Sequence, residues 1–212
     1  MSRKIRRVRV ELNAGGVRNL PAEEIKMILR GADDLIFSGG RTLLTKILKG
    51  SHDKKLLERN LDKSPAFGFY HELSPEEITA RIDWVLLQDY LDIEYDGRLP
   101  LLVYTEKGWE IEQETYAMEL LRGFDEKLKA GEQQFDMAYL KGKNRGLILL
   151  LLDKVEASGK KEYIPLLEAW GRVDYKKVKF RIHQVICRLD SQGGVKPQFA
   201  TANVQPNQET TP

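Results

Sequence analysis

The sequence predicts a mainly α-helical protein with one small β-hairpin. Apolar residues recur at helical spacing through most of the chain, and a single pair of alternating segments flanks the turn signal Asp96-Gly97. Gly and Pro residues separate these segments. Hydrophobic residues make up 42% of the 212 residues and charged residues 31%, so the chain has enough apolar side chains to build a core.

Residues 1–39 are predicted to form a basic arm and a lead-in helix. Residues 1–12 alternate basic and apolar side chains, a pattern that fits an edge strand or an arm that becomes ordered on a polyanion. Pro21 then opens a helix over residues 22–30, and we expect Gly31 to end it.

Residues 40–110 hold the most specific local pattern and are predicted to be one compact unit. Its first helix spans residues 41–49 and ends at Gly50, since glycine takes a positive φ easily. We expect Ser51 to cap a second helix over residues 52–60.

The second half of this unit is predicted to be a helix followed by the hairpin. Ser74-Pro75-Glu76-Glu77 is a strong helix start, with Ser as N-cap, Pro at the first position and Glu at the third. The strands are expected at residues 91–95 and 101–104, and Gly108 is expected to close the unit. Three helices followed by a two-stranded hairpin are the element order of the winged-helix fold.

The rest of the chain is predicted to be a helical extension. Residues 111–143 hold an amphipathic helix and a polar linker, and residues 144–190 hold a leucine-rich helix followed by a helix pair that looks like one HEAT-type repeat. A single repeat cannot bury its own apolar face, so the pair should pack on the leucine-rich helix or on a partner. Residues 191–212 lack periodicity, which is typical of a disordered tail.

A set of short motifs, taken in order, resembles the RQC domain, the winged-helix module that follows the motor of RecQ-family DNA helicases. The motifs are Leu48-Lys49-Gly50-Ser51, Lys55-Leu56, Phe67-Gly68, the helix from Ser74, Tyr90-Leu91 and Tyr104-Thr105-Glu106-Lys107-Gly108. The resemblance covers about a third of the chain. The whole chain looks like a stand-alone bacterial RQC-minor type of DNA-binding protein.

The resemblance implies contacts to DNA backbone phosphates around the Gly-Ser joint, where free N–H groups and flanking lysines suit an anion. His71 stands where helicase RQC domains have a lysine. The candidate DNA-binding residues are Arg41, Lys46, Lys49, Ser51, Lys54, Lys55, His71 and Arg98. This run of charged residues also fits an ordinary solvent-exposed surface that binds no ligand. The hairpin tip has no aromatic residue of the kind that splits a base pair in helicases, which leaves strand separation by the wing open.

The sequence shows no pattern typical of an enzyme. No G-x-x-x-x-G-K-[ST] motif is present, and the three histidines and Cys187 lack metal-ligand spacing, so we expect no catalytic residues, no metal and no cofactor. The single cysteine fits a reducing compartment, and the longest apolar run, residues 147–152, is too short to span a bilayer. We therefore expect a cytoplasmic protein without membrane association.

The leading hypothesis is a non-enzymatic protein that grips duplex or junction DNA with little sequence preference, in DNA repair, replication or recombination. The alternative is a protein-interaction adaptor that uses the winged-helix and HEAT-like surfaces, with a partner bound through the C-terminal helices. A sequence-specific transcription regulator is a third, weaker option, because the acids of the helix that begins at Ser74 would repel phosphates near the major groove.

Overall fold

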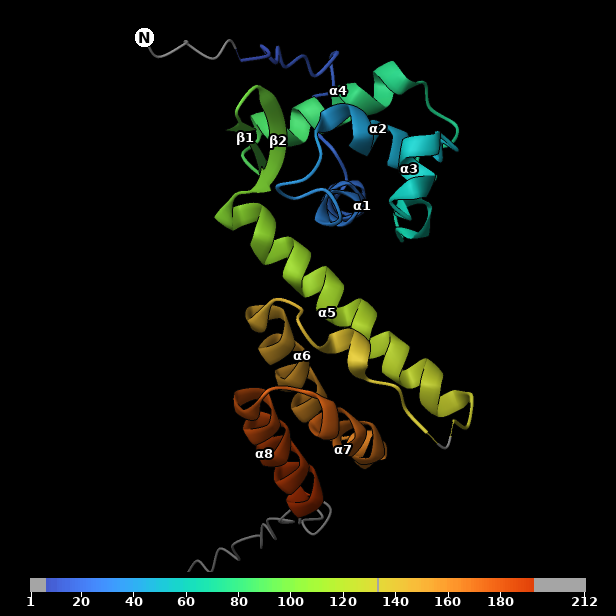
Figure 1. The fold of residues 1–212 in the computed structure, drawn as a ribbon, viewed down its shortest axis with the longest axis vertical. Helices are drawn as coiled ribbons and strands as arrows, with labels where there is room; N and C mark the ends of the chain where they lie inside the picture. Colours follow the sequence, from blue (N-terminus) through green and yellow to red (C-terminus); the bar gives the residue numbers. More distant parts are fainter. Residues whose placement is uncertain (1–6, 133, 193–212) are drawn as a thin grey trace, which may run out of the picture.

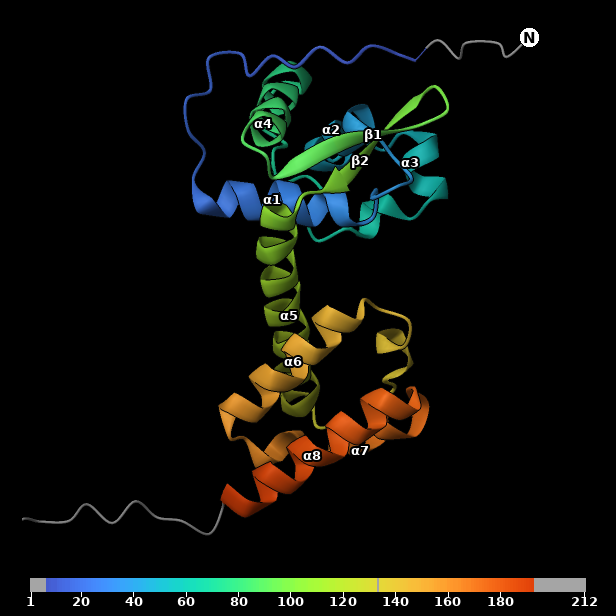
Figure 2. The ribbon, with the colours of Figure 1, turned by 90° about the vertical axis from the view of Figure 1, so that its left-hand side faces the viewer.

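The computed structural model describes residues 7–132 and 134–192, and this part of the chain contains eight α-helices and one two-stranded antiparallel sheet. The elements form two lobes, which are joined by the long helix α5 (Glu106–Lys129) (Figures 1 and 2). The predicted fold class, mainly helical with one small hairpin, is confirmed. Apart from residues 191 and 192, which belong to α8, the predicted disordered tail lies outside the described residues.

The N-terminal lobe has the winged-helix order of helices followed by a hairpin. Its elements are α1 (Ala22–Asp33), α2 (Arg41–Lys49), α3 (Lys54–Glu58), a short 3₁₀ helix (Leu61–Lys63), α4 (Pro75–Leu87), β1 (Leu91–Asp96) and β2 (Leu99–Tyr104). Each helix turns an apolar stripe toward one common core. Ile28 of α1, Leu44 of α2, Leu56 of α3 and Ile78 of α4 are all fully buried in it.

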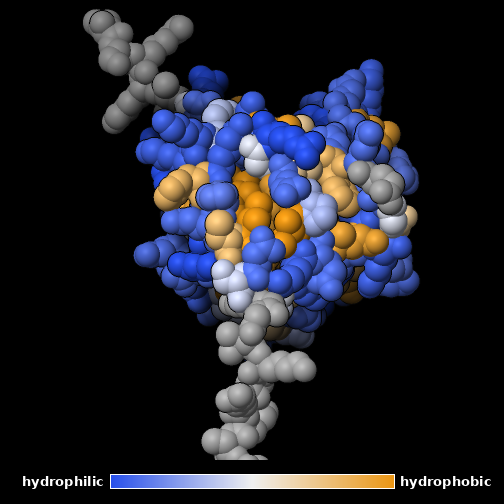
Figure 3. Space-filling model, turned by 90° about the horizontal axis from the view of Figure 1, so that it is seen from below, coloured by the Kyte–Doolittle hydropathy of each residue, from blue (hydrophilic) through white to orange (hydrophobic). Residues whose placement is uncertain are grey.

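The C-terminal lobe has a separate hydrophobic core. The second half of α5 packs there with α6 (Arg145–Ser158), α7 (Ile164–Val173) and α8 (Lys176–Gln192). Phe124 lies edge-on to Tyr163 and to Trp170, with ring centroids 6.0 and 6.2 Å away. From below, this lobe shows a hydrophobic area surrounded by hydrophilic side chains (Figure 3).

Two local predictions in the N-terminal lobe are wrong. Gly31 does not end α1 but lies inside it, where a Cβ would come within 3.1 Å of the Ala66 side chain and 3.2 Å of Leu44. The helix expected over residues 52–60 is only α3, and Asp53 rather than Ser51 caps it. The Asp53 Oδ1 atom accepts a hydrogen bond from the Lys55 N–H, in the first turn of the helix, at 3.0 Å.

Two predictions near the joint between the lobes are also wrong. Gly108 does not close a unit, because β2 leads directly into α5 and Gly108 lies in its first turn. The segment predicted as a polar linker contains a 3₁₀ helix (Ala138–Leu140), and Met137 and Leu140 are buried in the C-terminal core. The N-terminal residues 7–14 form neither helix nor strand, and they run along α4 and the hairpin (Figure 2).

Candidate nucleic-acid interface

Gly50 ends α2 in the left-handed conformation, with φ of 77°, as the sequence predicts. The last carbonyls of a helix lack intrahelical partners, and here the turn supplies them. The Gly50 N–H donates to the Ile47 carbonyl at 3.0 Å, and the Ser51 N–H donates to the Lys46 carbonyl at 2.9 Å. These two N–H groups therefore do not point outward as free anion donors, contrary to the expectation for the Gly-Ser joint.

The Phe67-Gly68 loop packs against this turn. The Gly68 N–H donates to the Ile47 carbonyl at 2.9 Å, and the Tyr70 N–H donates to the Leu48 carbonyl at 2.8 Å. A Cβ on Gly50 would lie 3.0 Å from the Gly68 Cα atom, so the close approach requires glycine at position 50, whereas Gly68 is favoured by its positive φ of 72°. The two motifs thus have a structural reason to occur together.

A cavity of about 370 Å³ between α2 and the start of α4 brings four of the eight candidate residues together. They are Arg41, Lys46, Lys49 and Ser51. Lys54 and Lys55 lie on α3, directly after this turn, whereas Arg98 lies at the hairpin tip. The candidate residues therefore form one cluster and a separate wing position.

The ammonium groups of Lys46 and Lys49 both have partners within the protein. The Lys46 Nζ atom lies 2.8 Å from Asp53 Oδ2, and this hydrogen bond lowers the pKa of Asp53 below its usual range. The Lys49 Nζ atom donates to the carbonyls of His71 at 2.6 Å and Leu73 at 2.8 Å. Lys49 thus holds the chain that leads into α4, a role that the charge count did not reveal.

Arg41 has a structural partner as well. Its Nη1 atom lies 2.6 Å from both carboxylate oxygens of Asp83, which is only 2% exposed, and 3.1 Å from the Glu11 carbonyl. The Asn13 N–H donates to the same carboxylate at 2.8 Å. Arg41 and Asp83 together fix the N-terminal segment against α4.

Lys54 and Lys55 are the candidate cations most available to a ligand. The Lys54 side chain is 88% exposed and has only a 3.8 Å pair with Glu58, four residues on. Lys55 is exposed, and its ammonium group makes no hydrogen bond or ion pair within the described residues. His71 is exposed too, but its Nε2 atom lies 2.8 Å from a Glu72 carboxylate oxygen.

The wing carries a basic segment that the set of candidate residues did not include. The Val8 N–H donates to the Arg98 carbonyl at 3.3 Å, and the Tyr95 hydroxyl donates to the Val8 carbonyl at 2.9 Å. The Arg7 guanidinium lies 5.1 Å from the centroid of the Tyr95 ring, and Arg9 is exposed. The alternation of arginines in the arm was the signal for these positions, but it did not show that the arm lies on the wing.

The Thr105–Gly108 motif has a structural role. The Thr105 hydroxyl caps α5 and donates to the Asp89 carbonyl at 2.7 Å. Lys107 donates to the Gln88 carbonyl at 2.8 Å, and its Nζ atom lies 3.7 Å from the centroid of the Tyr90 ring. A Cβ on Gly108 would lie 1.8 Å from the Tyr90 carbonyl oxygen. The motif locks the start of α5 to the end of α4, which explains its residue types without a ligand.

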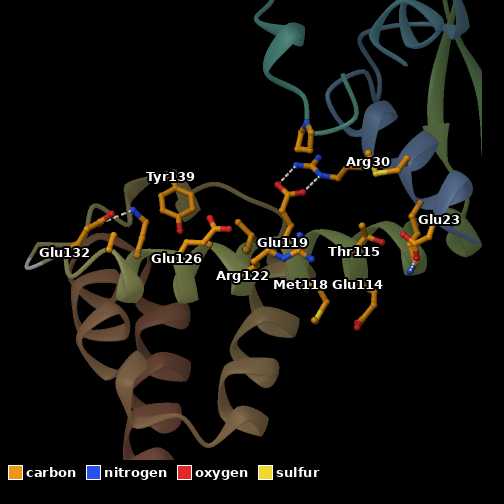
Figure 4. Close-up of a pocket in the computed structure, with 17 residues that line it drawn as sticks. Glu23, Arg30, Glu114, Thr115, Met118, Glu119, Arg122, Glu126, Glu132 and Tyr139 are labelled. Carbon is orange, nitrogen blue, oxygen red and sulfur yellow. Dashed lines mark hydrogen bonds and ion pairs between the residues drawn. The ribbon is translucent and has the colours of Figure 1, made fainter. Parts of the chain in front are cut away.

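A buried ionic cluster joins α1 to α5. The Arg30 Nε and Nη2 atoms donate to the two carboxylate oxygens of Glu119 at 2.7 and 3.1 Å (Figure 4). The guanidinium also lies 3.9 Å from the Tyr116 ring centroid and 3.8 Å from the Glu112 carboxylate. Arg30 borders a larger cavity of about 1180 Å³ between α1 and α5.

Glu112 is the most unusual acid in this cluster. It is fully buried, and neither of its carboxylate oxygens has a hydrogen-bond partner within the described residues. Burial raises the pKa of Glu112 to about 9, Arg30 opposes this rise, and the nearby acids Asp33 and Glu119 add to it. Burial alone would lower the pKa of Arg30, but the hydrogen bond to Glu119 raises it above its usual value.

Among the described residues, no group of three or more His, Cys, Asp or Glu side chains could hold a metal ion. Within the same residues, the helices are too short or too polar to cross a bilayer.

The comparisons with known proteins give one match. The family model described as the RQC domain matches residues 22–127. No curated protein and no solved structure matches the chain. The family match begins with α1 and ends two residues before the end of α5, so it includes the whole winged-helix order and nearly all of the joining helix. Because the match spans half of the sequence, the chain belongs to the RQC domain family of DNA-binding winged-helix modules.

Proposed function

We propose that this protein is a non-enzymatic DNA-binding protein that holds duplex or junction DNA through backbone phosphates, with little sequence preference. We place it in DNA repair, replication or recombination in the bacterial cytoplasm. Its winged-helix module supplies the contact, and the C-terminal helices supply a HEAT-like second surface.

The observation that carries this proposal is the pair of exposed lysines, Lys54 and Lys55, which directly follow the α2–α3 turn and have only one ion pair within the described residues, from Lys54 to Glu58 at 3.8 Å. A phosphate bound at this turn is held by these two cations, and Ser51 of the same turn lines the cavity between α2 and α4. Lys46 is a third cation, because a phosphate oxygen can replace the half-exposed Asp53 carboxylate as its partner. Arg98, with Arg7 beside it, gives a second contact at the wing.

The start of α4 disfavours reading of base edges. Glu76 and Glu77 lie in its first turn, and the backbone N–H of Ser74 bonds to the Glu77 carboxylate and lowers its pKa below the usual range. A permanently charged acid at the exposed end of this helix repels phosphates, so α4 is poorly suited to enter a major groove. Binding through phosphates alone carries no sequence information.

Fluorescence anisotropy on blunt and forked duplexes tests this proposal. With about four to six phosphates neutralised, the logarithm of the binding constant falls with the logarithm of salt concentration at a slope of about −4 to −5. Lys54→Glu with Lys55→Glu should abolish most of the binding. The matched control is Arg122→Glu with Lys129→Glu, which makes the same change of net charge on exposed positions of α5. Equal affinities of the two double variants would remove the proposed site.

A protein-interaction adaptor is the second candidate, because the cavity between α1 and α5 has the features of a protein-binding groove. Met118 is 46% exposed in it, and both acids and bases surround this apolar side chain, among them Glu114, Glu126 and Arg122 (Figure 4). Absence of DNA binding at low salt, together with a co-purifying protein that Met118→Asp releases, would favour this function over the first.

A further inference from the structure

The start of α8 (Lys176–Gln192) and Tyr175, the residue directly before it, combine exposed aromatic rings with lysines that form no ion pair within the described residues. Phe180 is 66% exposed, the largest value among the large apolar side chains of the described residues, and Tyr175 is 61% exposed. The buried residues of α8 are Val178, Ile182, Val185 and Leu189. At 100° per residue, Phe180 lies opposite this buried stripe, so packing within the lobe does not account for it.

Three lysines surround Phe180 on the same helix. Lys176 and Lys177 lie four and three residues before it, and Lys179 directly precedes it. Within the described residues, none of these ammonium groups forms an ion pair, and only Lys179 has a hydrogen bond, to the Arg172 carbonyl at 3.0 Å. The face is therefore positively charged around an apolar centre.

Asp190, the acid of α8 itself, lies ten residues after Phe180, about 15 Å along the helix, and the acids Asp174, Asp153 and Glu156 have other partners. Asp174 accepts hydrogen bonds from the Trp170 indole and from the Tyr175 N–H, both at 2.6 Å. On the side of α8 that faces α6, Arg181 lies 2.6 Å from Asp153, and Arg181 and Arg188 both pair with Glu156. The Lys141 ammonium group lies 5.3 Å from the centroid of the Tyr175 ring and adds a positive charge beside this surface.

We propose that this aromatic–basic surface, formed by Tyr175, Lys176, Lys177, Lys179 and Phe180, is a second nucleic-acid site that binds single strands. Unpaired bases stack on exposed aromatic rings, and lysines around the rings hold the phosphates that link those bases. A duplex hides the faces of its bases, so it offers these rings nothing to stack on. An acidic protein segment would use the lysines but would leave the two rings without a matching partner.

The surface lies in the C-terminal lobe, which α5 joins to the winged helix (Figures 1 and 2). The two sites lie on different lobes, so a duplex on the winged helix and its single-stranded extension on α8 would not compete for the same surface. The inference does not depend on the winged-helix site, because it stands on contacts within α8 and its neighbours.

Binding of a fluorescein-labelled oligothymidylate by the full chain tests this inference. Phe180→Ala should weaken binding to the oligothymidylate about tenfold and change binding to a blunt duplex less than about twofold. Phe180→Trp should keep the affinity and show a change of indole fluorescence on binding. Tyr139→Ala is the matched control, since this tyrosine is also exposed in the same lobe but has the acids Glu132 and Asp136 near it, together with Lys127.

Charge variants test the lysines separately. Lys176→Gln with Lys177→Gln should make the salt slope for the oligothymidylate less steep by about 1.4. The same binding should persist in the Lys54→Glu, Lys55→Glu variant, whatever that variant does to duplex binding. Equal affinity of Phe180→Ala and the parent protein, or equal loss in Tyr139→Ala, would overturn the proposal. Displacement of oligothymidylate by polyglutamate at equal charge concentration would assign the surface to an acidic protein instead.

Discussion

The cations of α2 and the cations of α8 look alike in the sequence but differ in the structure. Lys49 of α2 donates to two backbone carbonyls, and Arg41 is paired with the buried Asp83. Lys176 and Lys177 of α8 form no ion pair within the described residues and surround an exposed ring. A count of positive charges therefore does not separate residues that build the fold from residues that are free to bind a polyanion.

The difference follows from what each helix packs against. The helix α2 ends beside two loops whose carbonyls need donors, so its lysine and arginine side chains are recruited into the lobe. The helix α8 lies at the edge of the C-terminal lobe (Figure 1), and of the three lysines around Phe180 only Lys179 has such an acceptor among the described residues, the Arg172 carbonyl. Four substitutions, ordered by expected effect, test whether this division holds.

Arg30→Met should have the largest effect on stability. The Arg30 side chain is buried and lies against both Glu119 and Glu112. Its loss leaves these two acids without their positive partner. We expect a loss of about 3–5 kcal/mol in the free energy of unfolding, measured by urea denaturation. Arg122→Met, on an exposed position of α5, should change it by less than about 0.5 kcal/mol. Similar losses in both variants would contradict the division.

Glu112→Gln should stabilise the protein in a pH-dependent way. Below pH 4.5, the Glu112 carboxyl is protonated in both the folded and the unfolded chain, so it causes no pH-dependent loss of stability. Between pH 4.5 and about 9 the unfolded chain releases this proton while the folded chain retains it, and stability falls as the pH rises. The glutamine variant should thus gain about 2–3 kcal/mol at pH 8 and little at pH 4.

The control for this experiment is Glu110→Gln, which changes an exposed acid of the same helix. Its urea midpoint should follow the parent protein at every pH. A Glu112→Gln curve with the same pH dependence as the parent would show that Glu112 titrates normally in the folded state.

Lys49→Gln should cost about 1–2 kcal/mol of stability, because the shorter amide cannot hold both the His71 and the Leu73 carbonyls. Once allowance is made for folding, the variant should retain most of its affinity for duplex DNA. A large loss of affinity at unchanged stability would instead mean that Lys49 leaves its carbonyl partners to bind phosphate.

Much of the fold could be predicted because its signals are local. The end of α2 at Gly50, the capping box at Ser74 and the Asp96-Gly97 turn each depend on residues a few positions apart. The continuous helix through Gly108 could not be predicted, because glycine usually interrupts helices. Here the close Tyr90 carbonyl oxygen leaves no room for a Cβ, so the position requires glycine. The sequence could not reveal the Arg30–Glu119 pair either, since its members are 89 positions apart.

The sequence could supply candidate residues for the site, but it could not predict which of them form hydrogen bonds within the protein. Arg41, Lys46, Lys49 and Ser51, four of the eight candidate residues, line one cavity. Their hydrogen bonds depend on Asp53, Asp83 and loop carbonyls whose positions only the tertiary structure defines.

Lys55→Gln should have the smallest effect on stability and still change binding. The side chain contacts no partner within the described residues, so the free energy of unfolding should move by less than about 0.5 kcal/mol. If it neutralises one phosphate, the salt slope for a duplex should become less steep by about 0.9, and the affinity should fall about threefold to fourfold. Anisotropy titrations at several salt concentrations measure both quantities, and Lys129→Gln is the matched control. An unchanged slope with unchanged stability would place Lys55 among merely solvated lysines, and the phosphate site would then have to depend on Lys54 and on Lys46 leaving Asp53.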